Sequence, residues 1–138
     1  MPTAREIMTP DAECARAEET VLEAAEKMAR LDVGSLPICG SDDRLQGMLT
    51  DRDIVVKVLA AGKEPKACQV GELGQGKPVT IGADDDAREI LRTMASHKVR
   101  RLPVIDGHTL VGMVALADVA RALPDAPVGD LLDALTSD

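Results

Sequence analysis

The sequence predicts an α/β domain made of two copies of one β-α-β-β-α unit. Three observations support this prediction. The chain has 138 residues, which fits one domain with its own core. Residues of the first half recur in the same order in the second half. Each half alternates apolar residues at helical spacing with short apolar runs that are typical of strands.

The internal repeat can be followed residue by residue. Six residues of the expected helix and strand recur 66 positions later in the chain. They are Glu23, Met28, Ala29, Val33, Leu36 and Pro37, which match Glu89, Met94, Ala95, Val99, Leu102 and Pro103 in that order. The second repeat is one residue shorter in the following turn, so the offset then becomes 65. At this offset four more residues match: Leu45, Gly47, Met48 and Asp53 with Leu110, Gly112, Met113 and Asp118. A duplicated stretch of about 60 residues indicates two related structural units.

The first helix of repeat 1 is expected over 21–31. Thr20 and Glu23 form the capping-box pattern that starts a helix, and apolar residues then recur at helical spacing. Thr50 caps a second helix, which ends at Gly62. The other expected elements are a strand at 33–39, a turn at 40–43, a strand at 45–49 and this second helix at about 51–61.

The second unit repeats this order. Asp86 and Glu89 start its helix, and Pro124 stops its closing helix. Its strands are expected at 101–105 and 110–115, and its closing helix at 116–123. Short lead-ins precede the units at 5–8 and 70–73, and 128–131 looks like a third, which we expect to form a terminal helix that covers apolar surface. The predicted divisions are repeat 1 at 5–62, a linker at 63–69, repeat 2 at 70–123 and a C-terminal tail with a short helix at 124–138.

Each unit should expose one helix face and one sheet edge. We therefore expect the pseudo-symmetric repeats to pack sheet to sheet, and the clefts created between them are the kind of place where ligands bind.

Composition excludes several classes of function. Sixteen basic and 24 acidic residues give a net charge of −8, which disfavours general binding to nucleic acid. No apolar stretch is long enough for a membrane span, and the N-terminal residues lack the apolar core of a signal peptide, so we expect a cytoplasmic protein with no membrane partner. No nucleophile–base pair, phosphate-transfer motif or metal-ligand spacing is visible, so we expect neither an enzyme nor a metal site.

Two motifs carry a resemblance to a known family. Residues 35–38 (SLPI) and 101–104 (RLPV) resemble the Pro-containing strand of a CBS domain, and residues 47–54 (GMLTDRDI) resemble the segment that follows it. The lead-in at 7–10 also fits, so the resemblance covers about 5–123. It implies a tandem CBS pair, or Bateman module, that needs no cofactor and binds an adenosine-containing regulatory ligand such as AMP, ADP, ATP or S-adenosylmethionine. It also implies a homodimer.

The candidate ligand site is centred on Thr50 and Asp53. Helix capping alone explains this pair, but a helix start also offers free N–H groups to a phosphate. The Thr hydroxyl can donate to a phosphate oxygen, and the resemblance implies that the Asp carboxylate accepts from ribose hydroxyls. Repeat 2 keeps Asp118 but has Ala115 in place of the threonine. We therefore expect that only one cleft binds well, or that neither does.

Arg100 and Arg101 are adjacent arginines where repeat 1 has Gly34 and Ser35. A guanidinium group matches phosphate oxygens, and a surface ion pair is the alternative, which is the preferred interpretation for Arg100. The remaining candidates are apolar or proline residues that would wall an adenine ring: Val33, Leu36, Pro37, Val99 and Leu102. For each of the four apolar residues, core packing is the preferred interpretation.

Three cysteines leave two interpretations open. Cys14 is expected on the strand that enters repeat 1, and Cys39 follows the Pro-containing strand. A disulfide would require Cα atoms closer than about 7 Å, so the preferred interpretation is two packed thiols and the alternative is a redox-formed bridge. Cys68 is expected to be unpaired.

The leading functional hypothesis is a stand-alone, non-catalytic regulatory module that senses an adenosine-containing ligand in the cleft near Thr50 and Asp53 and acts through an unidentified protein partner. One alternative is a ligand-free dimeric scaffold in a stress response, which Ala115 and Gly34 favour. The other is a thiol- or metal-responsive module.

Overall fold

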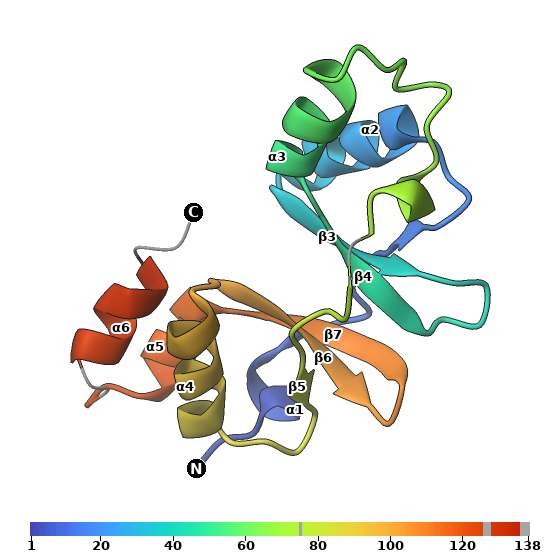
Figure 1. Cartoon of the computed structure of the whole chain (residues 1–138). Helices are drawn as coiled ribbons and strands as arrows, with labels where there is room; N and C mark the ends of the chain where they lie inside the picture. The colour runs from blue at the N-terminus through green and yellow to red at the C-terminus, as the bar shows by residue number, and fades with distance from the viewer. Residues whose placement is uncertain (75, 126–127, 136–138) are drawn as a thin grey trace. The chain divides into compact units, whose positions relative to one another are not determined.

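The structure is a computed structural model that describes residues 1–74, 76–125 and 128–135. Contacts divide the chain into two compact units. One consists of Glu13–Pro78 and holds most of repeat 1; the other joins Met1–Ala12 to Val79–Asp138 and holds repeat 2. Figure 1 shows the chain coloured from its N-terminus to its C-terminus.

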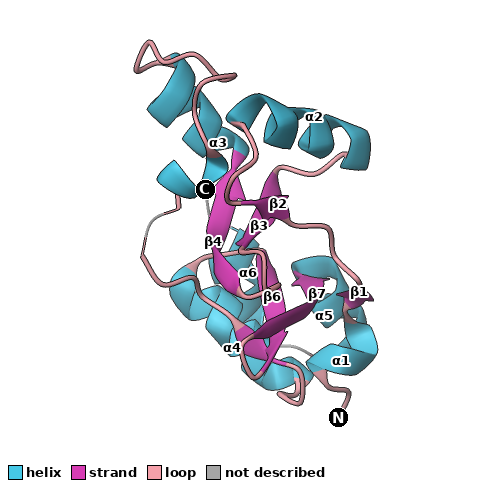
Figure 2. Ribbon diagram, turned by 90° about the vertical axis from the view of Figure 1, so that its right-hand side faces the viewer, coloured by secondary structure: helices cyan, strands magenta, loops and turns pink. Residues whose placement is uncertain are grey.

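The repeat-1 unit is a three-stranded sheet with helices packed against it. The sheet order is β2-β3-β4, with β2 parallel to β3 and β3 antiparallel to β4. The strands are β2 (Ala15–Arg16), β3 (Ser35–Cys39) and β4 (Leu45–Thr50). The helices are α2 (Val21–Leu31), α3 (Asp51–Asp53), which continues as the π-helix η1 (Ile54–Leu59), and the 3₁₀-helix η2 (Val70–Glu72). Figure 2 shows these helices in cyan and the strands in magenta.

The repeat-2 unit follows the same plan with additions. Its sheet order is β1-β7-β6-β5, with β5 parallel to β6 and the other neighbours antiparallel. The strands are β1 (Thr9–Pro10), β5 (Ile81–Gly82), β6 (Arg101–Asp106) and β7 (Thr109–Ala115). The helices are α1 (Ala4–Ile7), α4 (Ala87–His97), α5 (Leu116–Ala122) and α6 (Val128–Leu135).

The lead-ins of the two repeats are exchanged. The backbone N–H of Ala4 donates to the carbonyl of Asp85 in the repeat-2 unit (2.8 Å), and the N–H of Val70 donates to the carbonyl of Glu19 in the repeat-1 unit (2.8 Å). The two bonds join corresponding positions of the duplicated sequence. Each lead-in therefore packs on the repeat that it does not directly precede in the sequence. For this reason the boundaries of the two compact units differ from the repeat boundaries predicted from the sequence.

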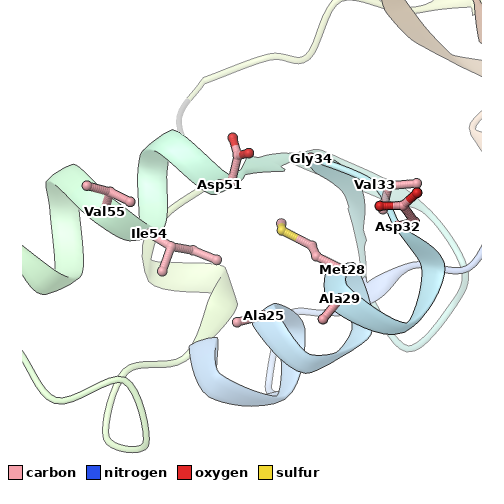
Figure 3. A pocket seen from close by; sticks show the side chains of 9 residues that line it. All are labelled: Ala25, Met28, Ala29, Asp32, Val33, Gly34, Asp51, Ile54 and Val55. Carbon is pink, nitrogen blue, oxygen red and sulfur yellow. The ribbon is translucent and has the colours of Figure 1, made fainter.

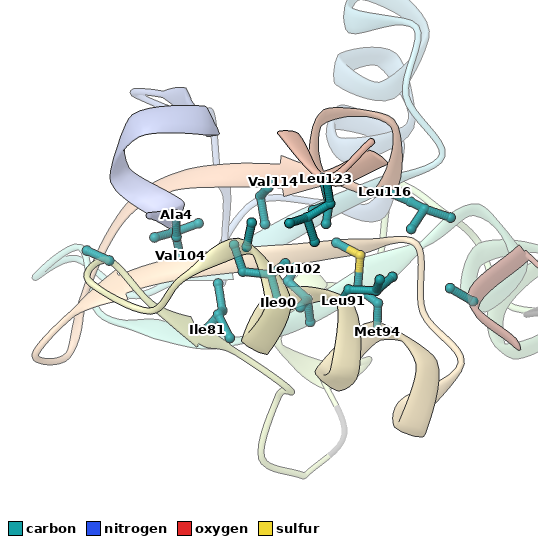
Figure 4. Close-up of a cluster of buried hydrophobic side chains, with 14 residues drawn as sticks. Ala4, Ile81, Ile90, Leu91, Met94, Leu102, Val104, Val114, Leu116 and Leu123 are labelled. Carbon is teal, nitrogen blue, oxygen red and sulfur yellow. The ribbon is translucent and has the colours of Figure 1, made fainter. Parts of the chain in front are cut away.

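Each unit has its own apolar core. In the repeat-2 unit, Ile90, Leu91 and Met94 of α4 face Leu102 and other strand residues, and all of these side chains are at most 2% exposed (Figure 4). A second cluster in the repeat-1 unit contains the corresponding Met28 and Leu36, among others. Aliphatic side chains and methionine build both cores, and the repeat-1 core also contains Cys68.

Local signals set the helix ends as expected. The hydroxyl oxygen of Thr20 accepts from the N–H of Glu23 (3.1 Å), and the carboxylate of Glu23 accepts from the N–H of Thr20 (3.2 Å), which completes the capping box. At the other end, Asp32 and its counterpart Lys98 both adopt the left-handed conformation, with φ of 55° and 54°. This conformation ends both helices and turns the chain toward the strand.

The terminal helix is confirmed: α6 packs on α4, and Ala134 is fully buried there. The strand expected at 33–39 was drawn too long, because β3 begins at Ser35 and Val33 still belongs to the turn after α2, where its N–H donates to the carbonyl of Met28. None of the described helices is both long enough and apolar enough to cross a membrane.

Candidate functional site

Thr50 and Asp53 lie where β4 gives way to α3. The Thr50 hydroxyl oxygen accepts from the backbone N–H of Asp53 (3.1 Å), and the Asp53 carboxylate accepts from the N–H of Thr50 (2.9 Å). This reciprocal cap fixes both side chains at the helix start. The hydroxyl hydrogen of Thr50 is not used by the cap, so it is available to donate to an acceptor such as a phosphate oxygen.

Asp53 and Asp118 have the same environment in the two repeats. The second carboxylate oxygen of Asp53 pairs with Lys57 (3.2 Å), and Asp118 pairs with Arg121 in the same way. The Asp118 carboxylate also accepts from the N–H of Ala115 (3.1 Å). The side chains of the two aspartates are 22% and 24% exposed, so each remains partly accessible. One difference between the repeats is the hydroxyl group that Ala115 lacks.

Arg101 lies directly opposite Ala115 across the β6–β7 pair, whereas Ser35 lies opposite Thr50 across β3–β4. Residues directly opposite in antiparallel strands project on the same side of the sheet. Arg101 therefore places a long cationic side chain beside Ala115, at the start of α5. At the corresponding helix start in repeat 1, Ser35 and Thr50 each carry a hydroxyl group instead. Arg100 and Arg101 are both exposed, and neither forms an ion pair within the described part of the chain. The surface ion pair considered for Arg100 is therefore not found.

The apolar candidates divide into accessible and enclosed side chains. Leu36 and Leu102 are 2% and 1% exposed and lie in the two core clusters, so core packing accounts for both of them. Pro37 is also buried. Val33 and Val99 are partly exposed at the edges of their cores and keep some surface for a ligand. Their role as walls for an adenine ring stays a prediction.

A cavity of about 510 Å³ opens between α2 and the start of α3–η1 in the repeat-1 unit (Figure 3). Met28 and Ile54 reach toward the space between the two helices. The lining residues are Ala25, Met28, Ala29, Asp32, Val33, Gly34, Asp51, Ile54 and Val55. The wall is mainly apolar and carries two carboxylates.

Gly34 explains how Asp51 fits into this wall. A β-carbon at Gly34 would lie 3.1 Å from a carboxylate oxygen of Asp51, and the carbonyl of Gly34 accepts from the N–H of Asp51 (2.9 Å). Repeat 2 has Arg100 and Leu116 at these positions. Because Gly34 has no side chain, the carboxylate of Asp51 can lie against it, and both residues line the cavity in repeat 1.

Cys14 and Cys39 form a disulfide bond, with an S–S distance of 2.10 Å and a Cα–Cα distance of 5.7 Å. The preferred interpretation of two packed thiols is therefore wrong. The sequence leaves Cys14 one residue before β2, and the parallel pairing of β2 with β3 places Ala15 opposite Ile38. Cys39 lies opposite Arg16 in this register, and the chain just before β2 brings Cys14 within bonding distance of it. Cys68 is free and buried, as expected for an unpaired thiol.

Sequence reasoning missed most of the cavity residues. The available signal was the run of apolar residues at 54–59 (IVVKVL), which is too continuous for a helix that buries a single face. Ile54 and Val58 are buried, whereas Val55, Val56 and Leu59 are about half exposed. Within the described ranges, no group of three or more His, Cys, Asp or Glu side chains could hold a metal ion.

The fold and these sites define a class: a duplicated α/β module in which each repeat presents an aspartate at the start of the helix after its second long strand. The chain belongs to the CBS domain family, whose model matches residues 4–60 and 70–125. The two matches correspond to the two repeats of a CBS pair.

The chain is similar to a curated mycobacterial protein over nearly its full length. It is 47% identical to hypoxic response protein 1 of Mycobacterium tuberculosis over 99% of this chain and 96% of that protein. A crystal structure of hypoxic response protein I with two coordinated zinc ions superimposes with a TM-score of 0.82 and 48% identity, covering 91% of this chain and 100% of the other. The structure of CBSX2 in complex with AMP matches with a TM-score of 0.77 and 25% identity, over 90% and 97% of the two chains.

Proposed function

We propose that this protein is a non-catalytic regulatory module that binds an adenosine-containing ligand, of the class of AMP, ADP, ATP or S-adenosylmethionine. In this proposal Asp53 accepts hydrogen bonds from the ribose hydroxyls and Thr50 donates one to a phosphate. Val33 offers apolar surface to the base. Asp118 has the equivalent role in repeat 2, where Arg101 supplies the phosphate contact that Ala115 cannot make.

The observation that carries the proposal is the fixed but accessible helix start at Thr50 and Asp53. The reciprocal cap holds the carboxylate in place before a ligand arrives, so little conformational entropy would be lost on binding. A carboxylate that already accepts two hydrogen bonds still has lone pairs for a ribose. CBSX2, a relative with the same fold, is known in complex with AMP, which supports the ligand class.

We propose a homodimer that passes its ligand state to a protein partner in a stress response, in keeping with the name of the mycobacterial relative. The cytoplasmic location expected from sequence stays a prediction. A disulfide is unusual in a reducing cytoplasm, and this argues for testing the location directly.

A thermal-shift panel tests the ligand class. A ligand at 100 times its Kd stabilises the native protein by roughly 2.7 kcal/mol, which corresponds to several degrees in Tm for a chain of this size. We expect AMP, ADP, ATP or S-adenosylmethionine at millimolar concentration to raise the Tm, and Asp53→Asn to reduce that rise. Glu18→Gln, on an exposed carboxylate with no ion pair in the described chain, is the matched control.

Each variant is compared with its own ligand-free Tm, because Asp53→Asn also weakens the cap. No rise in Tm with any of the four ligands would contradict the ligand class. A rise that is equal in wild type and in an Asp53→Asn/Asp118→Asn double variant would contradict the site.

The disulfide favours a second candidate function, a thiol-responsive module. Cys39 is buried in β3 and Cys14 is partly exposed, so reduction would change the packing at one edge of the repeat-1 sheet. This candidate predicts that ligand affinity or oligomeric state differs between the oxidised and reduced protein. Equal behaviour of both forms would leave the bond a purely structural element.

A further inference from the structure

The disulfide bond of the repeat-1 unit joins two cysteines that differ in their access to solvent. Cys39 is fully buried in β3, whereas Cys14, one residue before β2, is partly exposed. Thiol–disulfide exchange requires a thiolate to reach one of the two sulfur atoms directly. Exchange from solution is therefore directed to Cys14, with Cys39 as the leaving group. Partial exposure admits a small thiol more readily than the active site of a second protein.

Contacts other than the disulfide hold the main chain around Cys14. The ammonium group of Lys27 donates to the carbonyl oxygen of Cys14 (2.8 Å) and pairs with Glu19 (3.1 Å). The side chains of Lys27 and Glu19 are each 19% exposed, so water screens this pair less than a surface pair. Arg30 pairs with Glu13, the residue before Cys14 (3.2 Å). Cleavage of the S–S bond would therefore leave Cys14 near its place.

The chain that carries Cys39 is also held without the disulfide. The N–H of Ala17 donates to the carbonyl oxygen of Cys39 (3.1 Å), and the guanidinium group of Arg16 donates to the carbonyl oxygen of Gly40 (2.8 Å). Arg16 also pairs with Asp43 in the turn between β3 and β4 (2.8 Å). These contacts keep β2 beside β3 when the bond is open. The two sulfur atoms then keep a high effective concentration toward each other, so the bond can close again.

Cys14 lies close to a place where the chain passes from one compact unit to the other. This passage falls between Ala12 and Glu13. When the disulfide is closed, it ties the chain just after the passage to β3, because Cys39 belongs to that strand. When it is open, only hydrogen bonds and ion pairs hold the chain there. The state of the bond therefore sets how firmly the chain is held where it enters the repeat-1 unit.

We propose that Cys14 is a modification site at which a low-molecular-mass thiol forms a mixed disulfide. The thiolate of the small molecule attacks the Sγ of Cys14, and the S–S bond to Cys39 breaks. The electron pair of that bond goes to the Sγ of Cys39, which takes up a proton and becomes a thiol. In the reverse step the Cys39 thiolate attacks Cys14 and expels the small thiol. This inference rests on the thiol-responsive function proposed above and names its reactive atom and its product.

The first test incubates the native, disulfide-bonded chain in a buffer of reduced and oxidised glutathione, the small-thiol probe. Acid stops the exchange, and peptide mass mapping then locates the adduct. We expect one glutathione per chain on Cys14 and a free thiol at Cys39. Cys68 is the internal control, because it is a free thiol but only 6% exposed. It should stay unmodified in the native protein and react once the protein is unfolded.

The second test compares the two sulfur atoms as free thiols in a matched pair of variants. Cys39→Ser frees the thiol of Cys14, and Cys14→Ser frees the thiol of Cys39. We expect oxidised glutathione to modify native Cys39→Ser about tenfold faster or more, because a fully buried thiol reacts only when the structure opens locally. In urea the two variants should react at the same rate, which would show that the fold causes the difference.

The third test concerns the contact that holds Cys14 in place. Lys27→Met keeps an apolar side chain but removes the donor to the Cys14 carbonyl oxygen. In a fixed glutathione buffer we expect the ratio of mixed to closed disulfide to rise by about three- to tenfold, the effect of one lost hydrogen bond. Lys63→Met, on an exposed lysine with no ion pair in the described chain, is the control and should leave the ratio unchanged. An unchanged ratio in Lys27→Met would contradict the holding role of Lys27.

The outcomes separate the modification site from the function on which it rests. An adduct on Cys39, equal native rates for the two single variants, or no adduct at all would overturn the site. Exchange with a protein dithiol but not with glutathione would overturn the small thiol. Three titratable thiols in the untreated protein would remove the bond and the proposal together. If Cys14 is modified but ligand affinity and oligomeric state do not change, the site stands and the thiol-responsive function is wrong.

Discussion

A β-carbon at Gly112 would lie 2.6 Å from the carbonyl oxygen of Thr9, and equally close to the sulfur of Met8. This close approach arises because β1 pairs with β7 at Pro10 and Gly112. The N-terminal lead-in can therefore dock on repeat 2 only where β7 lacks a side chain. The corresponding glycine of repeat 1, Gly47, meets Gly74 at an ordinary 3.6 Å.

We expect Gly112→Ala to destabilise the protein by about 1–3 kcal/mol, because backbone or side chain must shift to admit the methyl group. The matched variant Gly47→Ala should cost much less. Urea unfolding measures both changes, and limited proteolysis should show an N-terminal segment that is cut faster in Gly112→Ala. Equal effects of the two substitutions would contradict the close packing of β1 on β7.

The disulfide between Cys14 and Cys39 should be visible chemically and thermodynamically. Thiol titration of the unreduced, denatured protein should find one thiol, that of Cys68, and three after reduction. Replacing both bridged cysteines by serine should lower the free energy of unfolding by about 3 kcal/mol, because the bond restricts the unfolded chain. Cys68→Ser is a control that keeps the bond. Three titratable thiols before reduction would show that the bond does not form.

The caps of the two repeats should respond in opposite directions. Thr50→Ala removes the hydroxyl that accepts from the N–H of Asp53, and we expect a loss of about 1 kcal/mol in the free energy of unfolding. Ala115→Thr introduces the missing cap and should stabilise repeat 2 by up to a similar amount. Chemical denaturation of both variants measures this. A destabilising Ala115→Thr would contradict the equivalence of the two helix starts.

The elements could be predicted from sequence because their determinants are local. The capping pair Thr20 and Glu23 marks the start of α2, and duplication of the pattern doubles the evidence for each element. The resemblance of α6 to a lead-in was sufficient to predict a covering helix. The position and type of a helix or strand can therefore be predicted wherever residues within that element determine them.

Long-range features could not be predicted in the same way. Nothing in the lead-in around Ala4 indicates that it packs on the other repeat, because both repeats offer similar apolar surface. The bond between Cys14 and Cys39 depends on a Cα separation that only the β2–β3 register supplies. For Leu36 and Leu102, by contrast, core packing was the preferred prediction, and the structure places both side chains in the cores.

Calorimetric titration with AMP and ATP tests the central claim most directly. If the carboxylate of Asp53 binds the ribose, wild type should show saturable heat, and Asp53→Asn should weaken binding about tenfold or more, because a hydrogen bond to a charged group contributes about 1.5–3 kcal/mol. Glu18→Gln should bind like wild type. Absence of heat with both nucleotides at millimolar concentration, or an Asp53→Asn affinity equal to that of wild type, would contradict the account.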